Sequence, residues 1–110
     1  MKLPNASGAV VDERKIRDYI LSKSHPIGRF KAAFFARGGF EAENWHDLAV
    51  QLRQLAVSGE ATRGESSEHG AKYMISGILK GPRGLSLEVT TVWLIPSGTS
   101  VPRLVTVYPR

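Results

Sequence analysis

The chain has 110 residues, the usual size of a single domain, and it is long enough to bury one hydrophobic core. Hydrophobic residues make up 42% of it, which excludes a disordered tail. It contains no cysteine, and this excludes a disulfide scaffold, a thiolate metal site and a cysteine nucleophile. We expect one domain over residues 1–110. The absence of cysteine fits a cytoplasmic, reducing environment, and we expect no secretory signal and no membrane span.

The positive charge is concentrated at one end of the chain. Residues 1–37 hold eight Lys or Arg against three Asp or Glu, whereas residues 38–110 hold seven of each kind. One interpretation is a solvated helix surface. The other is a face that attracts phosphate or an acidic partner. A membrane-surface helix fits less well, because Pro26 and Gly28 interrupt the basic region.

The first predicted element is a helix that begins after Asp12, a plausible N-cap, and ends near Ser22. Ile16, Tyr19 and Ile20 share one face of it at i, i+3 and i+4 spacing, which predicts the buried side.

Pro26 then predicts the start of a second helix at its first position, and this helix runs to about Arg37. Gly38 and Gly39 supply a left-handed exit. The residues expected to form its buried stripe are Phe30, Ala33 and Phe34.

A third helix is predicted between Asn44 as N-cap and Gly59 as the stop, with Asp47 as a weak capping-box partner. The apolar residues that line one face of it are Trp45, Leu48, Leu52 and Leu55.

After Gly59 the hydrophobic period changes from 3.6 to 2, which predicts strands. We expect strands over Tyr73–Leu79, Leu85–Ile95 and Arg103–Tyr108, with a weaker strand over residues 60–63. Short connections favour an antiparallel meander. The predicted fold class is therefore α+β, with two to three N-terminal helices packed on one face of a three- to four-stranded antiparallel sheet.

The segment from Ser24 to Lys31 is the most informative for chemistry. A helix start with free N–H groups favours an anion, and Gly28, Arg29 and Lys31 are the predicted phosphate-binding residues. His25 can transfer a proton near neutral pH. The alternative is that His25 only caps the helix and the two cations point into water.

The last predicted strand adds Arg103, Thr106 and Tyr108. Strand alternation puts Thr106 and Tyr108 on one side, so Arg103 joins them only if a bulge intervenes. The alternative is an ordinary strand that ends in a half-buried tyrosine. On the preceding strand, Thr91 and Trp93 share an apolar face, which favours a core position for Trp93 over a base-stacking platform.

No histidine has a partner at metal-ligand spacing, and no nucleophile elbow or dinucleotide glycine pattern is present. We therefore expect no metal and no cofactor.

Several blocks of sequence resemble a widespread bacterial family of short proteins that carry a domain of unknown function, similar to domains at the C-terminal ends of large secreted toxins. The blocks span nearly the whole chain: Leu3-Pro4-Asn5-Ala6, His25-Pro26-x-Gly28-x-x-Lys31-Ala32-x-x-Phe35, Gly39-Phe40, Thr91-x-Trp93 and Arg103-Leu104-Val105-Thr106-x-Tyr108-Pro109.

A more distant resemblance is to the barnase, EndoU, colicin and RelE-like group of metal-independent ribonucleases, which also place helices ahead of a four-stranded antiparallel sheet. This second likeness lies at the level of the fold. The chain departs from such an enzyme in having no clear acid and base pair, so His25 needs a second partner.

These observations lead to two hypotheses. The first is a metal-independent ribonuclease-like toxin or RNA-binding domain, whose partners are RNA and a small acidic cognate antitoxin or immunity protein. In this first hypothesis His25 is the general acid or base. Lys31 and Arg103 stabilise the phosphate charge, and Thr106 and Tyr108 position the substrate; all five are the predicted catalytic residues. The alternative is a non-enzymatic module whose basic helical face docks an acidic partner. A small-molecule hydrolase ranks last, because no nucleophile is visible.

Overall fold

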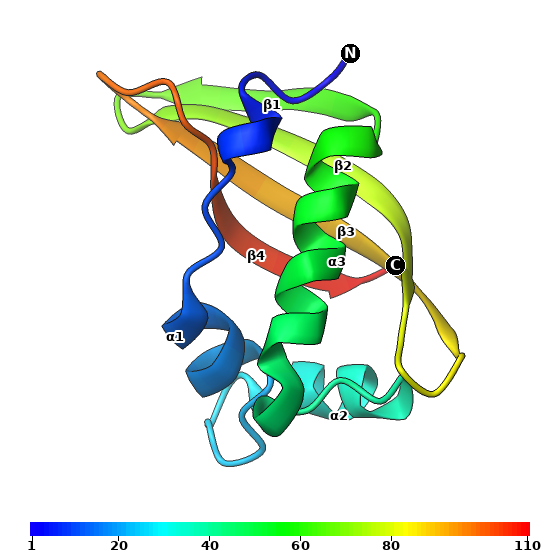
Figure 1. Ribbon diagram of the computed structural model, residues 1–110. Helices are drawn as coiled ribbons and strands as arrows, with labels where there is room; N and C mark the ends of the chain where they lie inside the picture. The colour runs from blue at the N-terminus through cyan, green and yellow to red at the C-terminus, as the bar shows by residue number, and fades with distance from the viewer.

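The computed structural model describes all residues 1–110 and has helices first and strands after them (Figure 1). Four strands form one antiparallel sheet in the order β1-β2-β3-β4, which confirms the predicted meander and the α+β class. The elements in chain order are η1 (Ala6–Gly8), α1 (Glu13–Lys15), η2 (Ile16–Ile20), α2 (Arg29–Arg37), η3 (Ala42–Asn44), α3 (Trp45–Ser58), β1 (Ala61–Ser67), β2 (Gly70–Lys80), β3 (Ser86–Pro96) and β4 (Arg103–Pro109).

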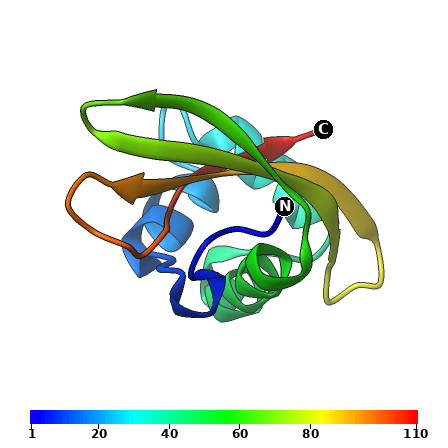
Figure 2. The same ribbon diagram turned by 90° about the horizontal axis from the view of Figure 1, so that it is seen from above.

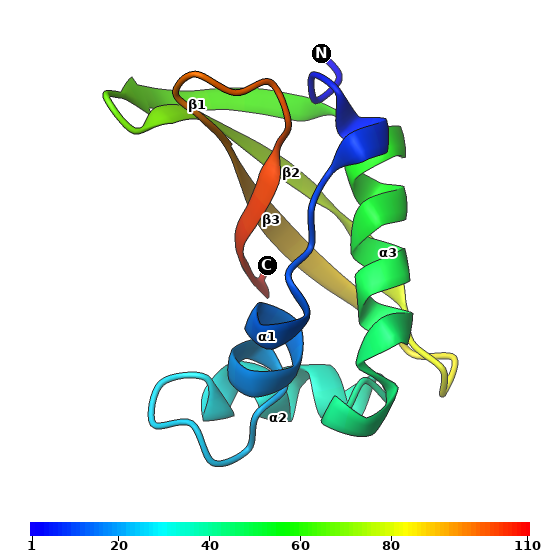
Figure 3. The same ribbon diagram turned by 60° about the vertical axis from the view of Figure 1, so that its left-hand side comes forward.

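α3 and the N-terminal helical segment lie on one face of the sheet, as the view from above shows (Figure 2), and α2 lies by the C-terminal end of β4 (Figure 3). The hydrophobic core fills the space between the two layers. Its largest fully buried side chains include Trp93 from β3, Phe35 from α2 and Leu48 from α3. The core position predicted for Trp93 is confirmed, because its side chain has no exposed surface.

Trp93 brings a polar atom into this core, and Thr91 satisfies it. The Trp93 Nε1–H donates to Thr91 Oγ1 at 2.8 Å, and Thr91 Oγ1 donates to the Ile75 carbonyl oxygen at 2.9 Å. A buried polar group without a partner destabilises the fold by roughly 1–3 kcal/mol, so this short chain of bonds fixes the β2–β3 pair.

The first helical segment begins as predicted at Asp12, whose carboxylate accepts from the Arg14 N–H at 2.8 Å. Its last turn, η2, is wound as a π-helix in which the Leu21 N–H donates to the Ile16 carbonyl at 2.8 Å. π segments are rare and often lie at functional sites.

The predicted buried stripe of α2 is wrong. Phe30 is 69% exposed and Ala33 is exposed, whereas Phe34 is half-buried. The helix buries Ala32 and Phe35 instead. It also begins at Arg29 rather than at Pro26, after a turn in which the Arg29 N–H donates to the His25 carbonyl. Of the two glycines that follow, Gly39 alone has a left-handed backbone, with φ of 94°.

The start of α3 differs from the prediction in its capping. Asn44 does not cap the helix with its side chain. Its Oδ1 accepts from the Glu41 N–H at 2.7 Å and closes a capping box around η3. The predicted apolar face is confirmed, since Leu48 and Leu52 are fully buried.

β4 is an edge strand with a bulge that decides where its side chains point. Val92 pairs with Thr106 and Trp93 pairs with Leu104, so Val105 is the extra residue. The N-terminal segment runs beside β4 (Figure 3), and Val10 forms an isolated parallel bridge with Arg103. β1 is longer than predicted and extends to Ser67. No helix is long and apolar enough to cross a bilayer.

Candidate functional site

Lys31 is the centre of the candidate site. Its Nζ donates to Thr106 Oγ1 at 2.6 Å and lies 5.4 Å from the centroid of the Tyr19 ring. The contact joins α2 to β4 across 75 residues of sequence. Burial lowers the pKa of Lys31, and the nearby positive charge of Lys15 lowers it further. The sequence-predicted pair Lys31 and Thr106 is therefore in direct contact.

Lys15 is the second cation at this place. Its Nζ donates to the Val105 carbonyl oxygen at 2.9 Å. Val105 is the bulged residue, and a bulge leaves its extra residue outside the regular ladder. The two ammonium groups thus bind successive residues of β4, Val105 and Thr106. Neither of them forms an ion pair with a carboxylate.

The bulge also brings Arg103 to the same side of β4 as Thr106 and Tyr108. Their partners on β3 are Leu94, Val92 and Thr90, which alternate with the core residues of that strand. Strand alternation allows Arg103 to share a side with Thr106 and Tyr108 only if a bulge lies between them, and the structure contains that bulge. Arg103 is exposed and lines a pocket of about 300 Å³ together with Lys15 and Asp12. It also forms no ion pair. We call Lys15, Lys31 and Arg103 the basic cluster.

Tyr108 lies two residues beyond Thr106 on this side, and 38% of it is exposed. No hydrogen bond holds its side chain to another part of the protein. It is therefore free to contact a bound molecule next to Thr106.

His25 is connected to the cluster through Tyr19. The two rings meet edge to face, with centroids 4.8 Å apart, and the same Tyr19 ring faces Lys31 Nζ. His25 Nδ1 accepts from the Ile27 and Gly28 N–H groups at 3.1 and 3.0 Å. This is the capping arrangement, and it leaves Nε2 as the ring nitrogen without a bond to the protein.

The remaining predicted phosphate-binding residues are placed differently. Gly28 is buried, its N–H is taken by His25, and a Cβ there would overlap the Tyr19 carbonyl oxygen. The glycine is therefore required for close packing of α2 against η2. Arg29 is exposed, and its Cζ lies 4.8 Å from the centroid of the Phe30 ring.

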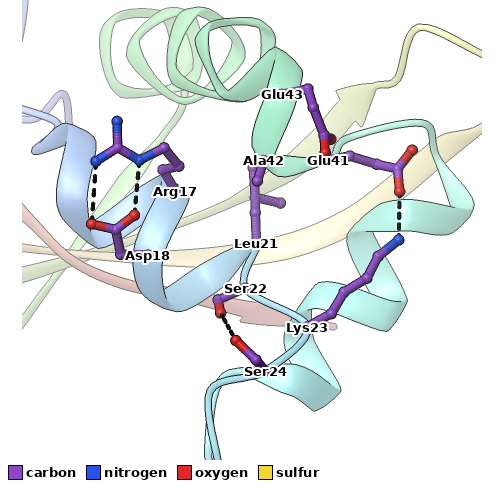
Figure 4. A pocket seen from close by; sticks show the side chains of 9 residues that line it. All are labelled: Arg17, Asp18, Leu21, Ser22, Lys23, Ser24, Glu41, Ala42 and Glu43. Atoms are coloured by element: carbon purple, nitrogen blue, oxygen red, sulfur yellow. Dashed lines mark hydrogen bonds and ion pairs between the residues drawn. The ribbon is translucent and has the colours of Figure 1, made fainter.

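The largest pocket lies elsewhere, between the loop after η2 and η3 (Figure 4). Its volume is about 650 Å³. Each cation in it has a carboxylate partner: Arg17 binds Asp18 at 2.8 Å, and Lys23 binds Glu41 at 2.7 Å. Glu43, which also lines it, adds a further negative charge. This pocket is therefore less suited to a phosphate than the basic cluster.

Two residues of the site, Lys15 and Tyr19, were not predicted from the sequence. They lie four residues apart, a spacing that places two side chains on the same face of a helix. A Lys–Tyr pair at this spacing in the most basic third of the chain is the sequence feature that could have indicated these two site residues. We interpreted Tyr19 only as a core residue, and it is half-buried.

The model of one protein family matches residues 2–110, nearly the entire chain. The chain belongs to the DUF6883 family, described as a domain of unknown function. This confirms the resemblance to a domain of unknown function. No curated protein matches the chain.

One similar solved structure is a chain of the contact-dependent growth inhibition toxin–immunity protein complex from Klebsiella pneumoniae 342. It has a TM-score of 0.70 and 22% sequence identity, and the match covers 92% of this DUF6883 chain and 99% of that chain. At this identity the likeness establishes a shared fold.

Proposed function

We propose that this DUF6883 domain binds the phosphate backbone of RNA at the basic cluster and cleaves it without a metal ion, as a ribonuclease-like toxin domain. The observation that carries the proposal is the Lys31–Thr106 contact, in which a half-buried ammonium group has a hydroxyl partner and no carboxylate. A cation removed from water without an acidic partner is costly, and a bound anion removes that cost.

Cleavage of RNA without a metal needs three things from the protein. A base takes the proton of the ribose 2′-hydroxyl as its oxygen attacks the neighbouring phosphorus. An acid gives a proton to the 5′-oxygen as its bond to phosphorus breaks. Fixed positive charge stabilises the phosphoryl oxygens during the exchange.

The side chains at the site can be assigned to these roles. Lys31 and Arg103 stabilise the phosphoryl charge, with Lys15 beside them. His25 is the candidate general acid or base: because Nδ1 accepts the two capping N–H bonds, Nε2 carries the proton of the neutral ring, and the proton transfer requires these capping bonds to break first. Thr106 and Tyr108 position the substrate. Tyr19 contacts both His25 and Lys31, which makes it the candidate for the second proton-transfer group.

The toxin assignment draws on the comparison. The similar chain belongs to a toxin–immunity protein complex, and the basic cluster suits neutralisation by a small acidic protein. The same two facts favour the alternative function, a non-enzymatic module that docks an acidic partner. The two functions differ in one respect, which is that only the first requires RNA to be cleaved.

A cleavage assay separates the two. Fluorescent single-stranded RNA is incubated with the domain in the presence of a metal chelator, and the fragments are resolved by length. We expect cleavage by the parent, loss of roughly 10²–10³-fold in rate in Lys31→Met, and no loss in Arg53→Met. Arg53 is an exposed residue of α3 without an ion pair, so this control removes the same charge elsewhere. A parent that cleaves no RNA leaves the interaction module as the better account.

A further inference from the structure

Phe30 is a large aromatic residue that the core does not use. It is 69% exposed, and Ile27, three residues before it, is 67% exposed. The buried positions of α2 are taken by Ala32 and Phe35, and Phe34 packs against the edge of the core. Phe30 is therefore left as an aromatic side chain in water at the beginning of the helix.

The helix that carries Phe30 is purely basic. The sequence of α2 contains Arg29, Lys31 and Arg37 and no acidic residue. None of these cations forms an ion pair, and the Arg29 guanidinium lies over the Phe30 ring with 4.8 Å from Cζ to the centroid. An anionic partner is complementary to this surface.

We propose that Arg29 and Phe30 form a stacking platform for one base of single-stranded RNA whose phosphate is bound by Lys31. This inference rests on the proposed RNA binding and names the substrate class. Phe30 and Lys31 are consecutive on α2, so their side chains leave the helix about 100° apart, and a nucleotide must span this turn to place its phosphate at Lys31 and its base at Phe30. Phenyl rings and guanidinium planes both stack on bases, and they tolerate any base because every base has a π-face.

The platform selects single strands. A base in a duplex is already stacked between its neighbours and cannot lie on a side chain without being extruded, which costs a few kcal/mol. Phosphate binding by the basic cluster does not distinguish single strands from duplexes, because both carry phosphates. Single-strand preference is therefore the property that Phe30 adds to the site.

The test compares two ligands of the same length and charge, a 2′-O-methyl hexaadenylate and an abasic 2′-O-methyl ribose-phosphate hexamer, neither of which has the 2′-hydroxyl that the proposed cleavage needs. Affinities are measured by fluorescence anisotropy for the parent, Phe30→Ala and Val57→Ala. Val57 is an exposed apolar residue of α3, 52% exposed, and serves as the matched control. We expect Phe30→Ala to weaken hexaadenylate binding by roughly 5- to 150-fold and to leave the abasic affinity and thermal stability unchanged.

The other outcomes have distinct meanings. Equal affinities of the parent and Phe30→Ala for hexaadenylate overturn the platform and leave Phe30 as an anchor for a protein partner, while binding of the abasic hexamer still supports the phosphate site. Equal weakening of both ligands in Phe30→Ala also overturns it, because base stacking cannot account for that loss. A parent that binds neither ligand refutes the proposed function together with the platform.

Discussion

Lys31 has an environment that a surface lysine does not have. Burial and the neighbouring Lys15 both disfavour its charged form and lower its pKa. At pH values between the lowered pKa of Lys31 in the folded protein and its ordinary pKa in the unfolded chain, the unfolded state binds more protons than the folded state. The stability cost of the buried charge is therefore present below the lowered pKa and disappears as the pH rises towards the unfolded value.

The same shift predicts the pH dependence of binding. Because its pKa is lowered, Lys31 loses its positive charge at a lower pH than a lysine with the ordinary pKa. As the pH is raised, the affinity for an anion should therefore begin to fall before lysines with the ordinary pKa lose their charge. A 2′-O-methyl oligoadenylate, which resists alkaline cleavage, is a suitable ligand. Lys31→Arg, whose guanidinium stays charged, should keep its affinity over this range. Parallel losses in parent and variant would show that Lys31 does not bind the anion.

His25 combines a capping role with a proposed chemical role, and two substitutions separate them. Asn also accepts N–H bonds at a helix start, so His25→Asn should keep the stability of the parent, whereas His25→Ala should lose about 1 kcal/mol. Both should lose roughly 10²–10⁴-fold in RNA cleavage rate if the imidazole transfers a proton. Thermal unfolding and the cleavage assay measure the two effects. Full activity in His25→Asn would reduce the residue to a cap.

At the scale of elements, α2 is held to the rest of the protein by its buried face. Phe35 has no exposed surface, and its ring meets those of Phe34 and Phe40 edge to face. Gly28 lets the turn before α2 approach η2 closely enough for Tyr19 to lie between His25 and Lys31.

Truncation of the phenylalanines of α2 should follow this orientation. Phe35→Ala should lower the free energy of unfolding by about 3–5 kcal/mol, because it removes a fully buried ring. Phe30→Ala should change it by less than about 0.5 kcal/mol, since that ring already lies in water. Denaturant unfolding of both variants is the measurement. The reverse order of losses would mean that α2 presents its other side to the sheet.

The elements themselves were largely predictable from the sequence, and the reasons are local. Alternation from Tyr73 onward marks the strands, and Asp12 and Gly59 mark helix ends. The buried face of α2 was not predictable, because six of its nine residues are Phe or Ala and several stripes fit equally well. Packing against the sheet decided between them.

The candidate site was predictable in part for a similar reason. Lys31 and Thr106 stood out by residue type and proved to be in contact. Lys15 was missed because its partner is a backbone carbonyl 90 residues away. That carbonyl is available because of the bulge at Val105, and nothing in the run Leu104-Val105-Thr106-Val107 distinguishes a bulged strand from a regular one.

At the scale of the whole molecule, the excess positive charge of the first third of the chain is brought against the last strand. The N-terminal segment runs along β4, and α1 and α2 lie by the end of that strand (Figure 3). The cations of the basic cluster therefore come from opposite ends of the sequence and are left without carboxylates. In the pocket between η2 and η3, by contrast, Arg17 and Lys23 are each paired with a carboxylate.

The most direct test of this account is the salt dependence of RNA binding. The logarithm of the affinity for a single-stranded 2′-O-methyl RNA, which lacks the attacking hydroxyl, is plotted against the logarithm of salt concentration for the parent, Lys15→Met/Lys31→Met and Arg53→Met. Each phosphate contact contributes a slope of about −0.7 for single strands, so the double variant should lose about 1.4 from the magnitude of the slope while Arg53→Met matches the parent. Equal slopes in all three proteins, or no binding by the parent at low salt, would contradict the assignment of the basic cluster as a phosphate site.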